Sequence, residues 1–265
     1  MKIFHESLKI FLTIIDMRLK RSLVFLNAIF PSYYPQKKPN EIEKLRSKKI
    51  INPFQCADLD PRTDEIFGRL SPCPKVSVVL PCYNEEETIL QVIQSIQCIK
   101  LPNYEIILVD DGSKDNSVQL VEGLENVNVY IHEKNQGYGK TLLDGIRKAT
   151  GDLVITIDSD GQHDPRDIPI LCKPILEGQA DIVVGSRYSG RYFYRVPLTN
   201  RAGEAFIERM IQFIFGQSVK NNQGGFRVFH KRTLDIFSKV RFMDMAFTTE
   251  ILMIALIKGY KITEG

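Results

Sequence analysis

The stretch Leu153–His163, LVITIDSDGQH, carries the strongest single signal in this chain. Its first five residues form a short, apolar, β-branched run, which is typical of a buried strand. Asp158 and Asp160 follow at once, so two carboxylates stand at the carboxyl end of that strand, where ligands bind in open α/β sheets. With Gln162 they offer only oxygen ligands, which suit Mg²⁺ or Mn²⁺ and not zinc. Such a cation commonly bridges phosphate oxygens, and this indicates a nucleotide-diphosphate enzyme.

Strands and helices alternate on both sides of this stretch. Apolar runs predict strands at 76–80, 104–109, 127–131 and 182–184, and helical periodicity predicts helices at 86–98, 115–124, 139–149, 165–176 and 251–258. This alternation predicts an α/β fold with a mostly parallel sheet covered by helices on both faces. No run of 18 or more apolar residues occurs, so we predict no membrane-spanning helix.

Polar clusters follow the predicted strands. Residues 81–86 read PCYNEE and residues 110–113 read DDGS, in addition to the acidic pair at 158–160. Helix capping by Asp, Asn or Ser explains any one cluster. Three acidic clusters at one sheet edge repel each other unless a cation or a ligand compensates. We therefore interpret this edge as a binding site.

Composition indicates a globular chain with an unusual amino-terminal arm. The 265 residues are 43% hydrophobic and 25% charged, enough for one substantial core. Residues 1–50 carry eleven Lys and Arg against four acidic residues, a net +7, so the remaining 215 sum to −4. A basic arm on a slightly acidic body favours an anionic surface such as membrane lipid.

The chain divides into three predicted parts. Residues 1–30 have apolar positions at helical spacing and predict an amphipathic helix, which either packs on the main domain or lies in a membrane interface. Residues 31–74 contain seven prolines and predict a connector that wraps the surface. Residues 75–265 form the predicted globular domain. The five cysteines form no CxxC pair, which argues against a zinc site and a disulfide framework and fits a reducing compartment.

Six ordered motifs run through the predicted globular domain. They are VVLPCYNEE (78–86), VDDGS (109–113), NQGYGK (135–140), DSDGQ (158–162), GSRY (185–188) and QGGFR (223–227). In this order they resemble the family 2 inverting glycosyltransferases of the GT-A fold. The last two narrow the resemblance to the polyprenol-phosphate branch, the dolichol-phosphate mannosyl- and glucosyltransferase-like enzymes. This resemblance implies transfer of a hexose from a UDP- or GDP-sugar to a polyprenyl phosphate.

The resemblance also implies a donor site. Its nucleotide-sugar residues are Pro81, Tyr83, Glu85, Asp110, Asp111, Lys140 and Asp158. Asp110, with Asp111 as a second candidate, accepts a hydrogen bond from a base N–H, a task that suits a carboxylate. Lys140 meets the diphosphate, although a place on a helix surface is the commoner fate of such a lysine.

The implied cofactor is Mg²⁺ or Mn²⁺. Asp160 and Gln162 hold it, and Asp158 binds either the metal or the ribose. The cation stabilises charge on the departing nucleoside diphosphate. His163 is a candidate fourth ligand, with a solvated loop histidine as the equal alternative. Catalytic roles fall to Asp158, Asp160 and Glu250.

The implied acceptor site uses cations. A phosphate monoester is already anionic near neutral pH, so it needs no general base. Arg187 and Arg201 bind its phosphate in the resemblance, and guanidinium groups suit phosphate oxygens. Two ordinary surface arginines are the alternative. The helix predicted at 202–215 is unusually apolar, which fits a polyprenyl groove or bilayer contact in addition to core packing.

Three features depart from the family pattern. Asn221 stands where an Asp is common, which removes a possible base and favours either a phosphate acceptor or weak activity. Gly224 and Ala205 each replace a usual Ser. The family pattern also continues beyond the point that corresponds to Gly265, with another strand and then membrane-contacting helices. Glu250 is the remaining acidic candidate for a base, or else it caps its helix or pairs with an arginine.

Two other functions stay open at this point. The same donor chemistry on a glycan or protein hydroxyl needs a base, either Glu250 or Asp244. A catalytically silent nucleotide-sugar-binding scaffold is the second. A dinucleotide oxidoreductase lacks support because no GxGxxG follows the first predicted strand. Expected partners are a nucleotide sugar, a polyprenyl-phosphate lipid and a membrane surface, with homo-oligomerisation open and no nucleic acid. The expected location is the cytoplasmic face of a membrane, as a peripheral protein, or the cytoplasm.

Overall fold

A computed structural model describes residues 61–185, 209, 212–213, 215–217, 224–243 and 246–265. The predicted amphipathic helix at 1–30, most of the predicted connector and most of the apolar helix predicted at 202–215 lie outside the described residues. The division of the chain at residues 30 and 74 therefore stays a prediction. Within the described ranges, none of the helices has the length and apolar character needed to cross a membrane.

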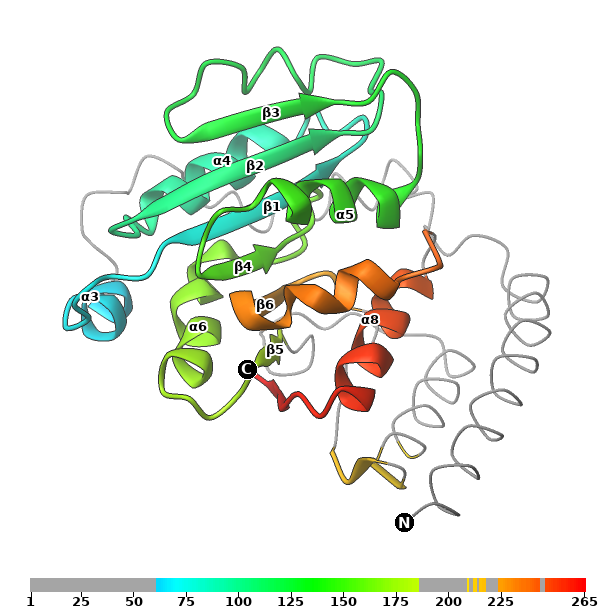
Figure 1. Cartoon of the computed structure of the whole chain (residues 1–265). Helices are drawn as coiled ribbons and strands as arrows, with labels where there is room; N and C mark the ends of the chain where they lie inside the picture. Colours follow the sequence, from blue (N-terminus) through cyan, green and yellow to red (C-terminus); the bar gives the residue numbers. More distant parts are fainter. Residues whose placement is uncertain (1–60, 186–208, 210–211, 214, 218–223, 244–245) are drawn as a thin grey trace. The chain divides into compact units, whose positions relative to one another are not determined.

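The described residues form one mixed seven-stranded sheet (Figure 1). Its strands are β1 (Val76–Cys82), β2 (Tyr104–Asp110), β3 (Val127–Ile131), β4 (Leu153–Thr156), β5 (Ile182–Val184), β6 (Arg227–His230) and β7 (Ile262–Glu264). They lie in the order β3-β2-β1-β4-β6-β5-β7. Only β6 runs antiparallel, against both β4 and β5. The prediction of a mostly parallel α/β sheet is confirmed.

Helices cover both faces of the sheet (Figure 1). They are α3 (Pro61–Phe67), α4 (Ile89–Cys98), α5 (Tyr138–Lys148), α6 (Ile168–Leu176) and α8 (Ala246–Ile257), with the 3₁₀ segments η1 (Pro165–Asp167) and η2 (Lys231–Lys239). Alternate residues of a strand point to opposite faces. Val78 accordingly packs with α4 and α6, whereas its neighbour Val79 packs with α5 and α8. Strands β1, β4 and β5 are buried on both faces, as their continuous apolar sequences require, whereas the edge strand β3 is largely exposed.

Helix α5 lies unusually close to the sheet. A Cβ atom at Gly145 would overlap the Cγ1 atom of Val79 on β1. Only glycine therefore allows α5 to approach the strand this closely. The amino end of α5 begins at Tyr138, beside the carboxyl edge of the sheet where the polar clusters lie.

One predicted helix is wrong. Residues 115–124 form consecutive turns and not a helix. The side chain of Asp115 accepts hydrogen bonds from the backbone N–H of Ser117, at 3.0 Å, and from its hydroxyl, at 2.6 Å. Such local bonds compete with the helical pattern. Gly123, with φ of 83°, then ends the segment in a left-handed conformation.

The structure shows a helix and a disulfide-bonded cysteine that were not predicted from the sequence. Helix α3 lies inside the predicted connector, and its Phe67 is 1% exposed and packed in the core. Cys98, the last residue of α4, is disulfide-bonded, so the prediction of a chain without disulfides is wrong at this position. An odd cysteine count excludes complete pairing but not a single bridge.

The amino edge of the sheet carries a closed polar network. Glu105 at the start of β2 accepts hydrogen bonds from Ser77 Oγ at 2.6 Å, Lys75 Nζ at 3.1 Å and both N and Oγ1 of Thr150 at 2.9 and 2.8 Å. Burial acts to raise the pKa of Glu105, but the bonds from Ser77, Thr150 and Lys75 outweigh burial and lower the pKa to about 2. This carboxylate has no capacity left for a ligand.

Candidate active site

Three loops are tied together at the carboxyl edge of the sheet. The loop after β1 is bonded to the loop after β2 through Asn84, whose N–H donates to Ser113 Oγ at 2.9 Å and whose Oδ1 accepts from Lys114 N at 2.8 Å. The loop after β4 joins them because Ser159 Oγ donates to Pro81 O at 2.7 Å. The predicted site residues on these loops are therefore held by one connected framework.

Asp110 ends β2 and is 1% exposed. Its Oδ2 accepts from the backbone N–H groups of Gly112, at 3.1 Å, and Ser113, at 2.9 Å. Its Oδ1 is buried and has no hydrogen-bond partner. Among the described residues, only one other buried side-chain atom lacks a partner, and that atom is Thr63 Oγ1. A buried acceptor without a donor is costly, so this oxygen is suited to receive a donor from a ligand.

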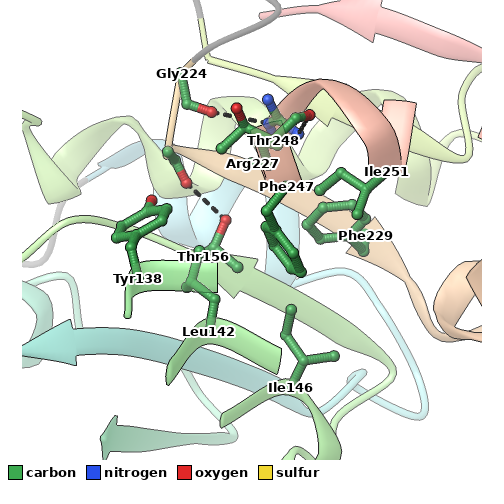
Figure 2. A pocket seen from close by; sticks show the side chains of 11 residues that line it. Tyr138, Leu142, Ile146, Thr156, Gly224, Arg227, Phe229, Phe247, Thr248 and Ile251 are labelled. Atoms are coloured by element: carbon green, nitrogen blue, oxygen red, sulfur yellow. Dashed lines mark hydrogen bonds between the residues drawn. The ribbon is translucent and has the colours of Figure 1, made fainter. Parts of the chain in front are cut away.

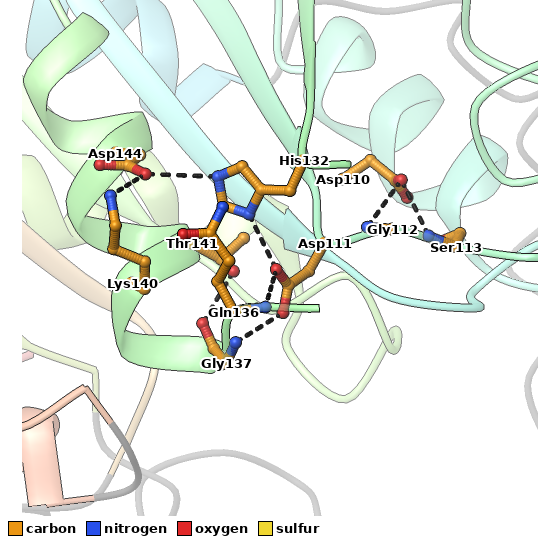
Figure 3. Close-up of polar contacts among 10 residues, drawn as sticks. All are labelled: Asp110, Asp111, Gly112, Ser113, His132, Gln136, Gly137, Lys140, Thr141 and Asp144. Atoms are coloured by element: carbon orange, nitrogen blue, oxygen red, sulfur yellow. Dashed lines mark hydrogen bonds and ion pairs between the residues drawn. The ribbon is translucent and has the colours of Figure 1, made fainter. Parts of the chain in front are cut away.

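Asp111 organises the turn before α5 (Figure 3). Its Oδ1 lies 2.8 Å from His132 Nδ1 and accepts from Gln136 N at 2.8 Å, while its Oδ2 accepts from Gly137 N at 2.9 Å. Gly137 has φ of 93°, a conformation that favours glycine. Both oxygens of Asp111 are thus engaged within the chain, which makes Asp110 the carboxylate of this pair with a free acceptor.

Lys140 belongs to the same network (Figure 3). Its ammonium group forms an ion pair with Asp144 one turn later on α5, and Asp144 also lies 3.3 Å from His132 Nε2. The side chain of Lys140 remains 31% exposed. The structure therefore places Lys140 on the first turns of α5, in an ion pair with Asp144. To bind a diphosphate, Lys140 would have to leave Asp144 or contact Asp144 and the diphosphate together.

Asp158 follows β4 and is restrained on several sides. Its Oδ1 accepts from the hydroxyl of Tyr138 at 2.8 Å, and its Oδ2 lies 3.4 Å from His163 Nε2. A Cβ atom at Gly225 would overlap both carboxylate oxygens. The His163 ring also packs on Phe226, with ring centroids 5.4 Å apart. His163 is therefore a partner of Asp158 and not an exposed loop histidine.

Asp160 and Gln162 lie in the turn that follows. The Oδ1 of Asp160 accepts from the backbone N–H of Gln162 at 2.9 Å, and Gly161 between them has φ of 72°. Among the described residues, no three His, Cys, Asp or Glu side chains form a preassembled metal site. Mg²⁺ and Mn²⁺ in nucleotide sites commonly take one or two carboxylates and complete their shells with phosphate oxygens and water. The oxygen donors of Asp158 and Asp160 fit a cation that binds together with a diphosphate.

The segment 224–225 forms a wall against Asp158, because a Cβ atom at Gly225 would overlap its carboxylate. Figure 2 shows Gly224 with its contact to Arg227. Thr156 Oγ1 donates to Gly225 O at 2.6 Å, and the buried guanidinium of Arg227 donates through Nε to Gly224 O at 2.8 Å. A second Arg227 nitrogen, Nη1, donates to Thr248 O on α8 at 2.7 Å. Strands β4 and β6 and helix α8 together fix this wall.

The other predicted donor residues border the same edge. Pro81 is buried, and its carbonyl accepts the Ser159 hydroxyl, while Tyr83 is 44% exposed. Glu85 donates its N–H to Ser117 Oγ at 2.8 Å, and its Oε2 accepts from Thr88 Oγ1 at 3.0 Å. Tyr83 is thus available as a surface for a ligand, whereas Glu85 is partly committed to holding its own loop.

Glu250 has a clear structural contact. It lies in the first turns of α8, and its Oε2 accepts from the backbone N–H groups of Arg241 at 3.0 Å and Phe242 at 2.9 Å. The adjoining Met243 supplies the carbonyl that accepts from Gly139 N at 3.1 Å. Glu250 therefore supports the segment that packs on the start of α5. Its role as a base stays a prediction.

Several predicted residues cannot be placed. Arg187, Arg201 and the alternative base Asp244 lie outside the described residues. Their assignment to the acceptor phosphate, or to a general base, stays a prediction.

The structure adds three site residues without a role in the sequence prediction, namely His132, Tyr138 and Arg227. His132 directly follows β3, so the same argument that selected the ends of the other strands applies to it. Tyr138 and Arg227 lie inside the NQGYGK and QGGFR motifs. Their contacts join elements far apart in sequence, and no local pattern reveals such contacts.

Comparisons with known proteins relate the chain to glycosyltransferases. The model of glycosyl transferase family 2 matches residues 77–237. A UDP-N-acetylglucosamine–dolichyl-phosphate N-acetylglucosaminyltransferase of Methanococcus voltae is 34% identical over 201 residues, which cover 68% of this chain and 79% of that protein. An undecaprenyl-phosphate 4-deoxy-4-formamido-L-arabinose transferase of Proteus mirabilis (strain HI4320) is 36% identical over 171 residues, 61% of this chain and 50% of that protein.

A solved structure supports the fold. Glucosyl-3-phosphoglycerate synthase from Mycobacterium tuberculosis, in complex with Mn²⁺, uridine diphosphate and phosphoglyceric acid, superposes with a TM-score of 0.59 at 23% identity. The match covers 76% of this chain and 71% of that one. At this identity the likeness concerns the fold, and it confirms the predicted GT-A architecture.

Proposed function

Because this chain belongs to glycosyl transferase family 2, we propose that it transfers a hexose from a uridine diphosphate sugar to a polyprenyl phosphate, with inversion at the anomeric carbon. That it is a glycosyltransferase follows from the family and from the named transferases among its relatives. The donor, the acceptor and the stereochemistry are the proposal.

The observation that carries the proposal is the spare acceptor of Asp110. Its Oδ1 is buried without a partner at the carboxyl end of β2. Uracil and guanine each present a ring N–H, whereas the corresponding ring nitrogen of cytosine is an acceptor and repels a carboxylate. The name of the Methanococcus voltae relative specifies a UDP-sugar as its donor. We therefore favour uridine, with guanosine as the second candidate.

The diphosphate and its cation would lie beside Asp158 and Asp160. Their carboxylates, with Gln162, would hold Mg²⁺ or Mn²⁺. A bound cation of this kind supplies electrostatic stabilisation of the departing nucleoside diphosphate. Lys140 on the first turns of α5 would add a positive charge by turning from Asp144 towards the phosphates. Asp111 holds the Gly137 turn from which α5 starts.

Polyprenyl phosphate is favoured as acceptor by the two relatives, whose names specify dolichyl and undecaprenyl phosphate. One oxygen of the acceptor phosphate forms a bond to the anomeric carbon while the bond from that carbon to the diphosphate oxygen breaks. The nucleoside diphosphate leaves with the bonding electron pair. The acceptor oxygen carries no proton near neutral pH, so the step needs no base. Arg187 and Arg201 are proposed to bind this phosphate.

A lipid acceptor implies work at a membrane surface. The net charge of +7 on residues 1–50 suits an anionic leaflet, and we propose that this arm provides peripheral contact with it. A hydroxyl acceptor would need a base instead, and Glu250 already accepts two backbone N–H groups through Oε2. These hydrogen bonds make Glu250 less suited to act as a base, which favours a phosphate acceptor over a hydroxyl acceptor.

A transfer assay with a labelled donor panel tests the proposal. UDP-sugars and GDP-sugars are offered with polyprenyl phosphate in detergent, and radioactivity in the organic phase is counted. We expect product with one nucleotide class only. The Arg187→Ala variant should lose lipid transfer far more than donor binding, while Arg69→Ala, which removes an exposed arginine, should resemble the parent. Labelled product on a glycan or protein hydroxyl, with none in the lipid phase, would contradict the proposed acceptor.

A further inference from the structure

Tyr138 reaches Asp158 from the first residue of α5. We propose that Tyr138 is a positioning residue, whose hydroxyl orients the Asp158 carboxylate towards the divalent cation and thereby sets the affinity of the site for that cation. The inference rests on the proposed function, because it takes Asp158 as a ligand of the cation.

The contact itself is direct. The Tyr138 hydroxyl donates to Asp158 Oδ1 at 2.8 Å, a normal length for such a bond. It joins helix α5 to the segment after β4. On the other oxygen, His163 Nε2 lies 3.4 Å from Oδ2, which is a longer and weaker contact. The contact from Tyr138 is therefore shorter than the contact from His163.

The position of Tyr138 is itself fixed. The preceding residue, Gly137, donates its N–H to Asp111 Oδ2 at 2.9 Å. The following residue, Gly139, donates to Met243 O at 3.1 Å, and a Cβ atom there would overlap the backbone of Met243. The start of α5 cannot shift without breaking these contacts. The tyrosine is therefore a rigid support and not a mobile side chain on a loop.

The backbone of Gly225 also packs against Asp158. The Thr156 hydroxyl donates to the carbonyl of Gly225, and the Arg227 guanidinium donates to the carbonyl of Gly224, so this backbone is held in place. A small cavity of about 10 Å³ lies between Tyr138 and this wall (Figure 2). It has room for about one water molecule. Loss of the Tyr138 hydroxyl would remove this donor from Asp158 Oδ1 and leave additional room for a water molecule.

Hydrogen bonds to a metal ligand from outside the coordination shell fix the orientation of that ligand. Their removal typically weakens metal binding by roughly 10- to 100-fold. Tyr138 donates to Oδ1 of Asp158, so the effect we propose is on the orientation of the whole carboxylate group. The Tyr138→Phe substitution removes one oxygen atom and keeps the ring, so it tests this bond with little change in packing.

The test is calorimetric titration of Mn²⁺ into protein saturated with UDP. Tyr138→Phe should weaken Mn²⁺ binding about tenfold, while UDP affinity in a chelator stays within about twofold. Its thermal midpoint should stay within about 2 °C of the parent, which excludes misfolding. Tyr130→Phe, a substitution on the edge strand β3, is the matched control and should bind Mn²⁺ as the parent does. In an Asp158→Asn background, Tyr138→Phe should change Mn²⁺ affinity less than twofold, because it acts through Asp158.

The outcomes separate the inference from the function on which it rests. Equal Mn²⁺ affinity in the parent and in Tyr138→Phe overturns the positioning role and leaves the proposed function intact. A tenfold loss that persists in the Asp158→Asn background also overturns it, since the effect would not pass through Asp158. A parent protein that binds UDP but no Mn²⁺ overturns both the metal assignment and the inference.

Discussion

Strand β2 carries Glu105 as its second residue and Asp110 as its last, and the hydrogen bonding of these two carboxylates differs. Glu105 accepts four hydrogen bonds from Lys75, Ser77 and Thr150. Asp110 uses one oxygen for two backbone N–H groups and keeps the other buried without a partner. The carboxylate at the amino edge of the sheet is fully hydrogen-bonded within the chain, whereas the carboxylate at the carboxyl edge has one oxygen without a partner.

This difference supports our proposal that the carboxyl edge of the sheet binds the ligand. Stability alone would select a partner for Asp110 Oδ1, as it has for Glu105, because an unpaired buried acceptor is unfavourable. An unpaired acceptor at the same sheet edge as the carboxylates of Asp158 and Asp160 is instead expected of a site completed by substrate. The same strand thus serves stability at one end and, in our proposal, recognition at the other.

The largest expected effect is at Asp160. Asp160→Ala should reduce transfer by roughly a thousandfold or more, because it removes a proposed cation ligand, while the thermal midpoint stays near that of the parent. Transfer kinetics and a thermal melt measure the two quantities. Asp167→Ala, which removes an acidic side chain 55% exposed, is the control and should keep its activity. Full activity in Asp160→Ala would remove the metal assignment.

Gly225→Ala should reduce kcat/KM by about a hundredfold. The new methyl group would overlap the Asp158 carboxylate and displace it, and displacements of about 1 Å at reacting groups have effects of this size. Gly178→Ala serves as the control, since it adds a methyl group to open space at φ of 71°. It should lower stability by about 1 kcal/mol without a change in kcat/KM. Equal kinetic losses in both variants would deny Gly225 a specific role.

A matched pair of substitutions sharpens the comparison on β2. Asp110→Asn should weaken UDP binding by roughly 10- to 100-fold, because it removes a charged acceptor, and should leave stability unchanged or higher. Glu105→Gln should do the reverse, with an unfolding free energy lower by about 1 to 2 kcal/mol and unchanged UDP affinity. Calorimetry and chemical denaturation give both numbers. Loss of stability in Asp110→Asn with unchanged UDP binding would reverse the assignment of the two edges.

The smallest expected effect is on the acid stability of the chain. The pKa of folded Glu105 is about 2, below its ordinary value of 4.5, so the unfolded chain binds more protons between these values. The contribution of Glu105 is therefore complete above about pH 4.5 and disappears as pH falls towards 2. The difference in unfolding free energy between the parent and Glu105→Gln should shrink over this range. A constant difference would mean that the Glu105 bonds do not depend on its charge.

The sequence was sufficient for those parts of the fold that depend on local patterns. Apolar runs predict β1, β2, β4 and β5 because strands buried on both faces must be largely apolar. The β-branched residues of β3 predict a strand, which lies at the sheet edge and is partly exposed. The helix predicted at 115–124 failed because Asp115 bonds to Ser117 in preference to the helical pattern. Strand β6 was not predicted, since its pairing with β4 and β5 is a long-range contact of a segment read only as a motif.

The candidate site shows the same limit. Asp110, Asp158 and Asp160 were predictable because each stands at the end of an apolar strand. Sequence could not distinguish Asp110 from Asp111, since the difference is that His132, Gln136 and Gly137 fold back onto Asp111 alone. The support of Asp158 by Tyr138 also depends on where α5 packs, which the positions of both residues in sequence do not reveal.

The central claim is that the unpaired oxygen of Asp110 recognises a ring N–H of the donor base. Calorimetric titration with UDP, GDP and CDP, each with and without Mn²⁺, tests it most directly, because the three ligands share a diphosphate and differ in the base. We predict that UDP, or else GDP, binds with Mn²⁺-dependent affinity and that CDP binds at least about tenfold more weakly. CDP binding as tight as the other two, or no binding by any of them, would contradict the account.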